Sequence, residues 1–229
     1  MLAILKKEFK HYFLSPMGYV YIGVFLLVYS FVFYNFIFLQ QSNTLSYLFN
    51  YWPILLLLPL MISILTMRSF AEERKTGTEQ LLLTSSTSVT KIVLGKFFAA
   101  ASVVVITNLL FFIYFIILSC FGNPEFMTTL VSVFGFILLL LSFVAFGIFA
   151  SSLVENQIIA AILSIIYISV AVFLPQFVTA AEFLSPTSAF FNSFSSGTIG
   201  IADLVLILSY TVMFIIFTIM VIQRRKNIK

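Results

Sequence analysis

The sequence predicts an all-α integral membrane protein with six transmembrane helices. Of its 229 residues, 62% are hydrophobic and 9% are charged, whereas soluble domains carry about 25% charged residues. The apolar residues also gather in runs of roughly 20, the length that a helix needs to cross the hydrocarbon core of a bilayer. One soluble core cannot hide this much apolar surface, but a bilayer can, so composition determines the class of protein.

Six segments have the length and hydrophobicity of membrane spans. They are residues 17–39, 52–69, 93–119, 128–151, 157–178 and 202–223. Each is expected to be helical, because lipid offers backbone groups no hydrogen-bonding partners. The first apolar run is longer than the roughly 7–15 residues of a signal-peptide core, and no cleavage motif follows it. We therefore expect it to be retained as the first span of a single membrane domain over residues 1–229.

The basic residues predict the topology. All twelve lie in residues 1–16, between residues 68 and 96, or in the tail after residue 223, and the connections at 40–51, 120–127 and 179–201 contain none. Six spans place both termini on one side of the membrane, and the positive-inside rule makes that side the cytoplasm. The segment 179–201 is then extracytoplasmic.

Residues 1–16 are predicted to form a separate helix that lies in the membrane interface. Apolar residues recur at helical spacing on one face, and basic residues occupy the other. The apolar residues are Leu2, Leu5, Phe9, Tyr12 and Phe13, and the polar ones are Lys6, Lys7, Lys10 and His11. The alternative is a charge cluster that only sets the topology.

The residues that many membrane enzymes and ion-coupled transporters need are missing. The interiors of the six spans contain no Asp, Glu, Lys, Arg or His. Arg68 and Lys96, near the ends of spans two and three, are counted with the connection between them. Cys120 is the only cysteine, and no phosphate-binding loop is present. We expect no catalytic residue, metal or cofactor in this chain, so another subunit must supply the energy for any uphill transport.

The region 70–92, predicted to be cytoplasmic, is unlike the rest of the chain. The second span is expected to continue as a helix through Glu72–Lys75 and to stop at Gly77. Thr78 can cap a new short helix with Glu79 in its first turn. Leu81, Leu82 and Leu83 then form an exposed apolar ridge. From the residues alone, two interpretations are open: a helix that docks on another protein, or a solvated loop whose leucines pack on the bilayer surface.

The same region carries a family resemblance. The run LTMRSFAEERKTGTEQLLLTSS, followed by IVLGKFFAA, between Leu65 and Ala100 resembles ABC-2-type ABC transporter permeases, most closely the gliding-motility-associated branch. Similar motifs are LKKEFKHYFLSPMGY at 5–19, GNPEF at 122–126 and GIFASSLVENQIIA at 147–160. The resemblance thus extends over nearly the whole chain.

The resemblance implies a site and partners. Between spans two and three, such permeases carry a coupling helix that contacts a separate ABC ATP-binding subunit, where ATP and Mg would bind. Carried over, the ATPase-coupling residues are Glu72, Glu73, Arg74, Gly77, Thr78, Glu79, Leu81, Leu82 and Leu83. A secondary cytoplasmic contact falls on Glu155, Asn156 and Gln157. Further implied partners are a second permease copy or sister permease and an accessory subunit with an extracytoplasmic domain, but no nucleic acid.

The leading hypothesis is therefore the permease subunit of an ATP-driven exporter in a bacterial cytoplasmic membrane. The lack of charge in the spans favours a hydrophobic, lipid-like or peptide cargo. Two alternatives stay open: a secondary transporter or channel, which would need ionisable residues at mid-membrane, and a membrane anchor or assembly module that needs no ATPase.

Overall fold

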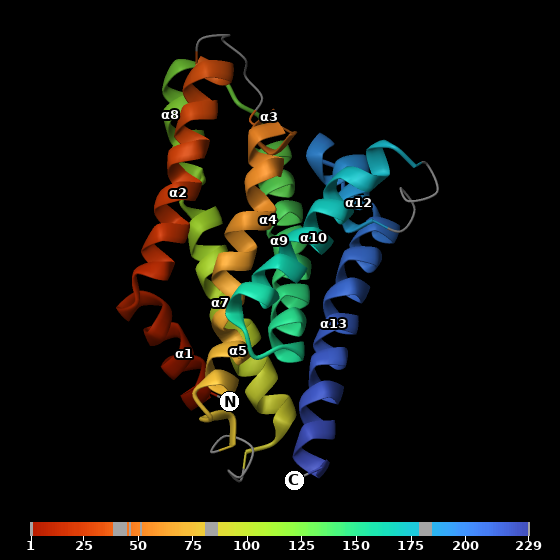
Figure 1. Ribbon diagram of the computed structural model, residues 1–229. Coiled ribbons are helices and arrows are strands. Elements are labelled where there is room, and N and C mark those ends of the chain that lie inside the picture. The colour runs from red at the N-terminus through yellow and green to blue at the C-terminus, as the bar shows by residue number, and fades with distance from the viewer. Residues whose placement is uncertain are drawn as a thin grey trace.

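The computed structural model describes residues 2–38, 45, 47–50, 52–80, 87–178 and 185–228. Within these residues the chain is mostly helical, without a β-strand, and its long helices run side by side (Figure 1). Six of the helical segments are long and apolar enough to cross a membrane. The predicted fold class, an all-α membrane protein with six spans, is confirmed.

Each predicted span corresponds to one long helix or to two consecutive ones. In chain order they are α2 (Pro16–Val32) with its π-helical extension η1 (Phe33–Phe38); α4 (Trp52–Thr66) with α5 (Arg68–Lys75); α7 (Val89–Leu109) with α8 (Phe112–Phe121); α9 (Phe126–Leu153); α10 (Gln157–Phe173) with the short η2 (Leu174–Gln176); and α13 (Ile201–Ile228). The remaining elements are α1 (Leu2–Leu14), α3 (Tyr47–Asn50), α12 (Pro186–Asn192) and η3 (Phe194–Ser196).

The third span is broken where the sequence predicts a continuous helix. The break lies at Leu110 and Phe111, between α7 and α8. Just before it, Thr107 Oγ1 and Asn108 Nδ2 donate hydrogen bonds to the carbonyls of Val103 and Val104, four residues earlier. Such side chains compete with backbone N–H groups for the same carbonyls and bend helices. We attribute the break to this competition.

Helix α9 lies at the centre of the bundle and packs against α4, α5, α7, α10 and α13 (Figure 1). Small residues let its neighbours approach closely, as is common between membrane helices. A Cβ atom added to Gly147 would overlap the side chain of Thr66 on α4, and one added to Gly135 would overlap the ring of Phe194. Any movement of α9 must therefore involve most of the spans.

Aromatic side chains fill the core between the spans. The ring of Phe49 lies 4.8 Å from that of Phe136 and 5.0 Å from that of Phe111, measured between centroids. Phe190, from α12, packs 5.7 Å from Phe136. Tilted and edge-on pairs of this kind add to the stability gained from burying apolar area. They fix α3, α9 and α12 against one another.

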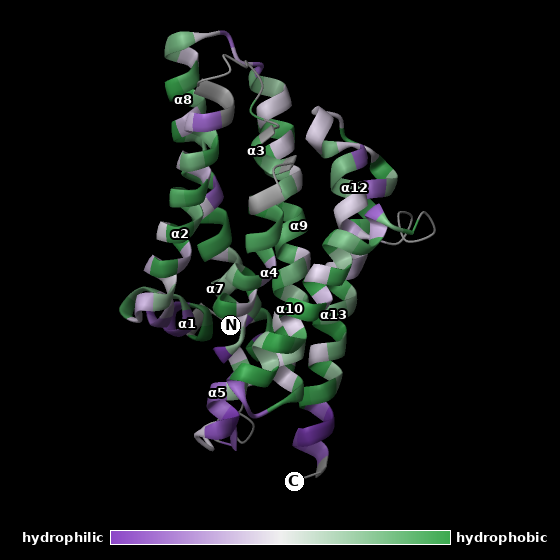
Figure 2. Cartoon of the chain, turned by 45° about the horizontal axis from the view of Figure 1, so that its top comes forward, coloured by the Kyte–Doolittle hydropathy of each residue, from purple (hydrophilic) through white to green (hydrophobic). Residues whose placement is uncertain are grey.

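The two ends of the bundle differ in polarity. Figure 2 shows hydrophobic residues along the spans and hydrophilic residues on α1, on α5 and on the last turns of α13. We call the end formed by α1, α5, the α9–α10 connection and the last turns of α13 the charged end.

At the opposite end Ser185 caps α12, accepting a bond from the Thr187 N–H, and Pro186 occupies the first helical position.

Candidate functional site

Helix α5 extends the second span into the charged end, as the sequence predicts. It runs to Lys75, and Gly77 follows with φ of +74°, a left-handed conformation that favours glycine. Thr76 Oγ1 donates to the carbonyl of Glu72, and Thr78 Oγ1 donates to that of Glu73. The Thr78 hydroxyl, predicted as the cap of a new helix, thus bonds the end of the preceding one. Helical structure resumes at Glu79, and Leu81–Leu83 lie outside the described residues.

The α9–α10 connection lies directly beside α5. Arg74 forms an ion pair with Glu155, with 2.8 Å between Nη2 and Oε1, and its Nη1 donates to the carbonyl of Leu153 at 3.2 Å. Asn156 caps α10 by accepting a bond from the Ile158 N–H, and Gln157 is the first residue of that helix. The structure thus brings together the two regions that the sequence predicts as contact sites, which are about 80 residues apart in the chain.

The last turns of α13 complete this surface. Arg225 approaches Glu79, with 3.4 Å between Nη1 and Oε1, and its Nη2 donates to the same Leu153 carbonyl at 3.4 Å. Glu79 is nearly buried by this arrangement. One backbone oxygen therefore receives donors from α5 and from α13. Sequence analysis assigned Arg225 only to the basic tail, and no pattern in the sequence indicates its partner.

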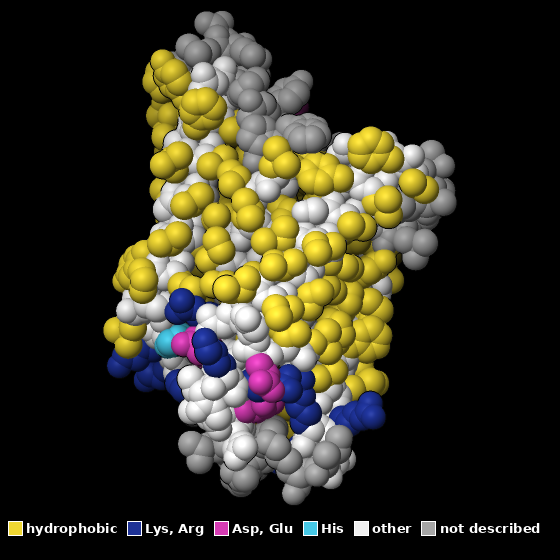
Figure 3. All heavy atoms as spheres, viewed as in Figure 1, with side chains coloured by type: hydrophobic (Ala, Val, Ile, Leu, Met, Phe, Trp, Pro, Cys, Tyr) yellow, Lys and Arg dark blue, Asp and Glu magenta, His cyan; other side chains and the backbone are white. Residues whose placement is uncertain are grey.

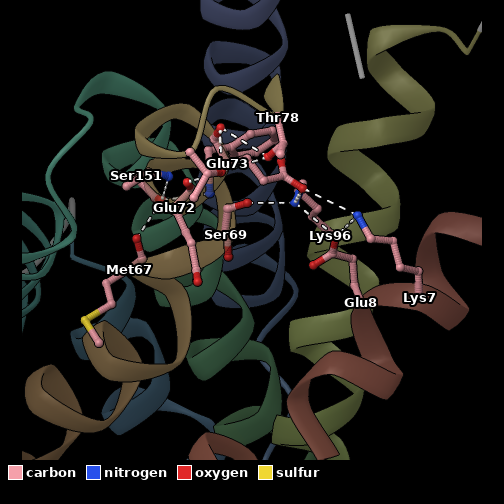
Figure 4. Close-up of polar contacts among 12 residues, drawn as sticks. Lys7, Glu8, Met67, Ser69, Glu72, Glu73, Thr78, Lys96 and Ser151 are labelled. Atoms are coloured by element: carbon pink, nitrogen blue, oxygen red, sulfur yellow. Dashed lines mark hydrogen bonds and ion pairs between the residues drawn. The ribbon is translucent and has the colours of Figure 1, made fainter. Parts of the chain in front are cut away.

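A single hydroxyl joins α5 to α9 at the junction with α4. Ser151 Oγ accepts hydrogen bonds from the backbone N–H groups of Phe70 and Ala71 at 3.0 and 3.1 Å, and donates to the Met67 carbonyl at 2.9 Å (Figure 4). A side chain inserted into the helical hydrogen-bond ladder is a recognised cause of a helix break. It explains why the helix is interrupted at Met67 without a glycine or proline.

The sequence interpretation was wrong about Lys96. It belongs not to the connection but to the interior of α7, and only 2% of its surface is exposed. Its Nζ lies 2.9 Å from Glu73 Oε1 and 3.1 Å from Glu8 Oε1, and donates to the Ser69 carbonyl at 2.7 Å (Figure 4). The Phe70 ring lies 5.1 Å away. A buried ammonium needs such partners, because an unpaired charge away from water is very costly.

This buried cluster ties α1 to the bundle. Glu8 comes from α1 and Glu73 from α5, so Lys96 links three helices. Nearby, the Tyr12 hydroxyl donates to the Leu65 carbonyl at 3.2 Å, and burial raises the pKa of Tyr12 to about 12, which keeps this donor protonated. Glu73, predicted as a coupling residue, points inward to Lys96, whereas Arg74 points toward the α9–α10 connection.

A comparison with models of protein families shows which family the chain belongs to. The family model described as ABC-2 family transporter protein matches residues 2–227. The chain belongs to the ABC-2 transporter family. A comparison with curated proteins gives no significant match. ABC-2 proteins are membrane components of transporters and normally work with a separate ATP-binding subunit.

For an ABC-2 protein, the charged end is the natural candidate site. It gathers Arg74, Glu79, Glu155 and Arg225 on one surface below a broad hydrophobic belt (Figure 3). Within the described residues, no group of three or more His, Cys, Asp and Glu side chains is arranged to hold a metal ion. The arrangement is suited to contact and transmission of movement.

Proposed function

We propose that this ABC-2 protein is the permease subunit of an ATP-driven exporter, and that a partner ATPase docks at its charged end. The observation that carries the proposal is the double attachment of Arg74, to Glu155 and to the Leu153 carbonyl. It joins α5 and the α9–α10 connection into one surface that is continuous with spans two, four and five. A protein that presses on this surface moves three spans together.

The proposed mechanism is a rocking movement of packed helices. ATP and Mg would bind in the partner, whose closure displaces α5 and the residues that follow Gly77. Ser151 and Arg74 carry that displacement to α9, and Arg225 carries it to α13. Rigid-body movement between two packed states is an established form of such coupling. A second permease copy or sister permease would supply the other wall of the transport path.

We also propose a location, a topology and a class of cargo for this protein. We place the protein in a bacterial cytoplasmic membrane with both termini in the cytoplasm, because all twelve basic residues fall in the three sequence segments that six spans put on one side. The lack of charged side chains in the middle of the spans favours a hydrophobic, lipid-like or peptide cargo. Within the family, the motifs at 65–100 and 147–160 favour the gliding-motility-associated branch.

The proposal is tested by isolating the tagged chain from its own membrane in mild detergent. We expect a second subunit to remain bound and the isolated assembly to hydrolyse ATP. Recovery of the chain as a stable oligomer without any ATP-binding subunit, across several mild detergents, would favour the membrane-anchor alternative.

The chain by itself is expected not to hydrolyse ATP. Its sequence has no GxxxxGK[ST] loop, which in ATPases surrounds the phosphates with backbone N–H groups. The measurement is phosphate release by the chain expressed and purified in a host that lacks the partner gene. Turnover that co-elutes with the pure chain would contradict the proposal.

Thiol labelling tests the proposed topology. In a Cys120→Ala background, which removes the exposed native thiol, Asn123→Cys at the opposite end should react with an impermeant maleimide added outside intact cells. Lys75→Cys at the charged end should react only after the membrane is opened. Both positions are exposed, so access to each depends on its side of the membrane. Labelling of the Lys75→Cys variant from outside intact cells overturns the topology.

A further inference from the structure

A pocket lined mainly by polar and charged residues lies between α1, α5 and the start of α7. Its volume is about 260 Å³. Lys7, Glu8, Arg68, Glu72, Glu73 and Lys96 contribute the charged part of its lining. Pockets that enclose drug-sized ligands span roughly 300–1,000 Å³. This pocket is therefore of a size for a small polar group and too small for a whole lipid.

The charges that line the pocket are balanced. Three are cationic, at Lys7, Arg68 and Lys96, and three are carboxylates, at Glu8, Glu72 and Glu73. A lone anion would find as many repulsive as attractive neighbours here, and so would a lone cation. The lining is complementary to a group that carries both signs of charge.

The pocket also has hydrogen-bonding capacity that the protein leaves unused. The three protons of Lys96 are directed to Glu8, Glu73 and the Ser69 carbonyl, so this residue is structural. Among the described residues, however, the buried atoms Arg68 Nε and Glu73 Oε2 have no hydrogen-bond partner. Leaving a buried polar group unpaired costs about 1–3 kcal/mol. The pocket thus holds an unpaired donor and an unpaired acceptor, together with the unpaired hydroxyl oxygen of Ser69.

The position of the pocket indicates where its ligand comes from. Ser15 and Met17, at the junction of α1 with the first span, form part of the lining. Apolar side chains nearby face outward: Leu14 is 75% exposed and Tyr19 is 62% exposed. Figure 3 shows charged side chains, with the single histidine among them, directly below the hydrophobic belt. The pocket therefore opens at the level of lipid headgroups.

We propose that this pocket binds the headgroup of a phospholipid that carries both a phosphate and a primary ammonium, as phosphatidylethanolamine does. Arg68 and Lys7 would bind the phosphate, and Glu72 and Glu73 would accept hydrogen bonds from the ammonium. The acyl chains would lie along Leu14 and Tyr19. A choline headgroup has no N–H to donate, and a glycerol headgroup has no cation, so both should bind more weakly.

Native mass spectrometry of the delipidated full chain tests the proposal. Phosphatidylethanolamine, phosphatidylcholine and phosphatidylglycerol with identical acyl chains would be titrated separately. We expect the first to bind at least fivefold more tightly than the other two. Arg68→Gln should remove most of that preference, lowering the affinity for phosphatidylethanolamine about tenfold. Lys75→Gln, an exposed position on the same helix outside the pocket, should leave it unchanged.

Each alternative outcome overturns the proposal. Equal binding of the three lipids means annular contact only, and preferred binding of phosphatidylglycerol means a simple basic site. An Arg68→Gln variant that keeps the wild-type preference also refutes the assignment. If that variant does not fold, Glu72→Gln provides a second test, and the comparison of lipids on the wild-type chain needs no variant. Because lipid binding is measured without a partner ATPase, the result does not depend on the proposed function.

Discussion

Replacing Lys96 with methionine is expected to cause the largest loss of stability of any single substitution at the charged end. The change removes the cation shared by Glu8 and Glu73 and leaves both carboxylates without their closest partner. Breaking a buried ion pair by removing one member costs about 3–5 kcal/mol. We expect a large fall in the thermal unfolding temperature in detergent, and detachment of α1 from α7, measured as faster hydrogen exchange in residues 2–14.

Two matched variants separate this effect from a general loss of helix stability. Lys91→Met, on the exposed surface of the same helix, should have little effect. The triple variant Lys96→Met, Glu8→Gln, Glu73→Gln should recover much of the stability, because it removes the uncompensated charges together with the cation. A Lys96→Met chain as stable as the wild type would show that this cluster does not hold α1 in place.

Leu82→Asp is expected to abolish binding of the ATPase while leaving the permease in the membrane. The prediction depends on the proposed docking role of the leucines that follow Glu79. A carboxylate buried without a partner in an interface costs several kcal/mol, which corresponds to a loss of two or more orders of magnitude in affinity. Glu79 itself is a poorer position for this test, because it already contacts Arg225 within the chain. Co-purification of the ATPase with the tagged variant is the measurement.

The control for this prediction places an aspartate at an exposed apolar position at the opposite end. Met127, in the first turn of α9, is 72% exposed, and Met127→Asp should retain the ATPase at wild-type levels. If Leu82→Asp also retains it, the docking assignment fails and the leucines are better explained as packing on the bilayer surface. Equal membrane abundance of the two variants is required for the comparison.

The sequence predicts the long helices well because their hydrophobicity is a local property. Each predicted span has its counterpart, and α5 continues the second span to Lys75, just before the left-handed Gly77, as predicted. The breaks at Met67 and Leu110 were not predicted. The first depends on Ser151, about 80 residues away in the chain, and the second on the hydrogen bonds of polar side chains within an apolar run.

The candidate site was also predicted only in part, because its contacts join residues that are far apart in the chain. The charged segments were predicted, but their pairing was not, because a count of charges does not say which ones meet. Lys96 lies in the second turn of α7, but the sequence analysis counted it as part of the connection. Nothing in the local sequence indicates that Glu8 and Glu73 lie beside it. Arg225 likewise acquires its partners only when α13 is placed beside α5 and α9.

The Ser151 hydroxyl also affects the stiffness of the assembly. A helix interrupted at Met67 without support would bend there under load, and a displacement applied to α5 would be absorbed before it reached the spans. Three hydrogen bonds to one side chain of α9 restrain that bend. If an ATPase docks on α5 as we propose, the second span should act as an angled rod braced against α9, and little of the applied displacement should be lost as local bending.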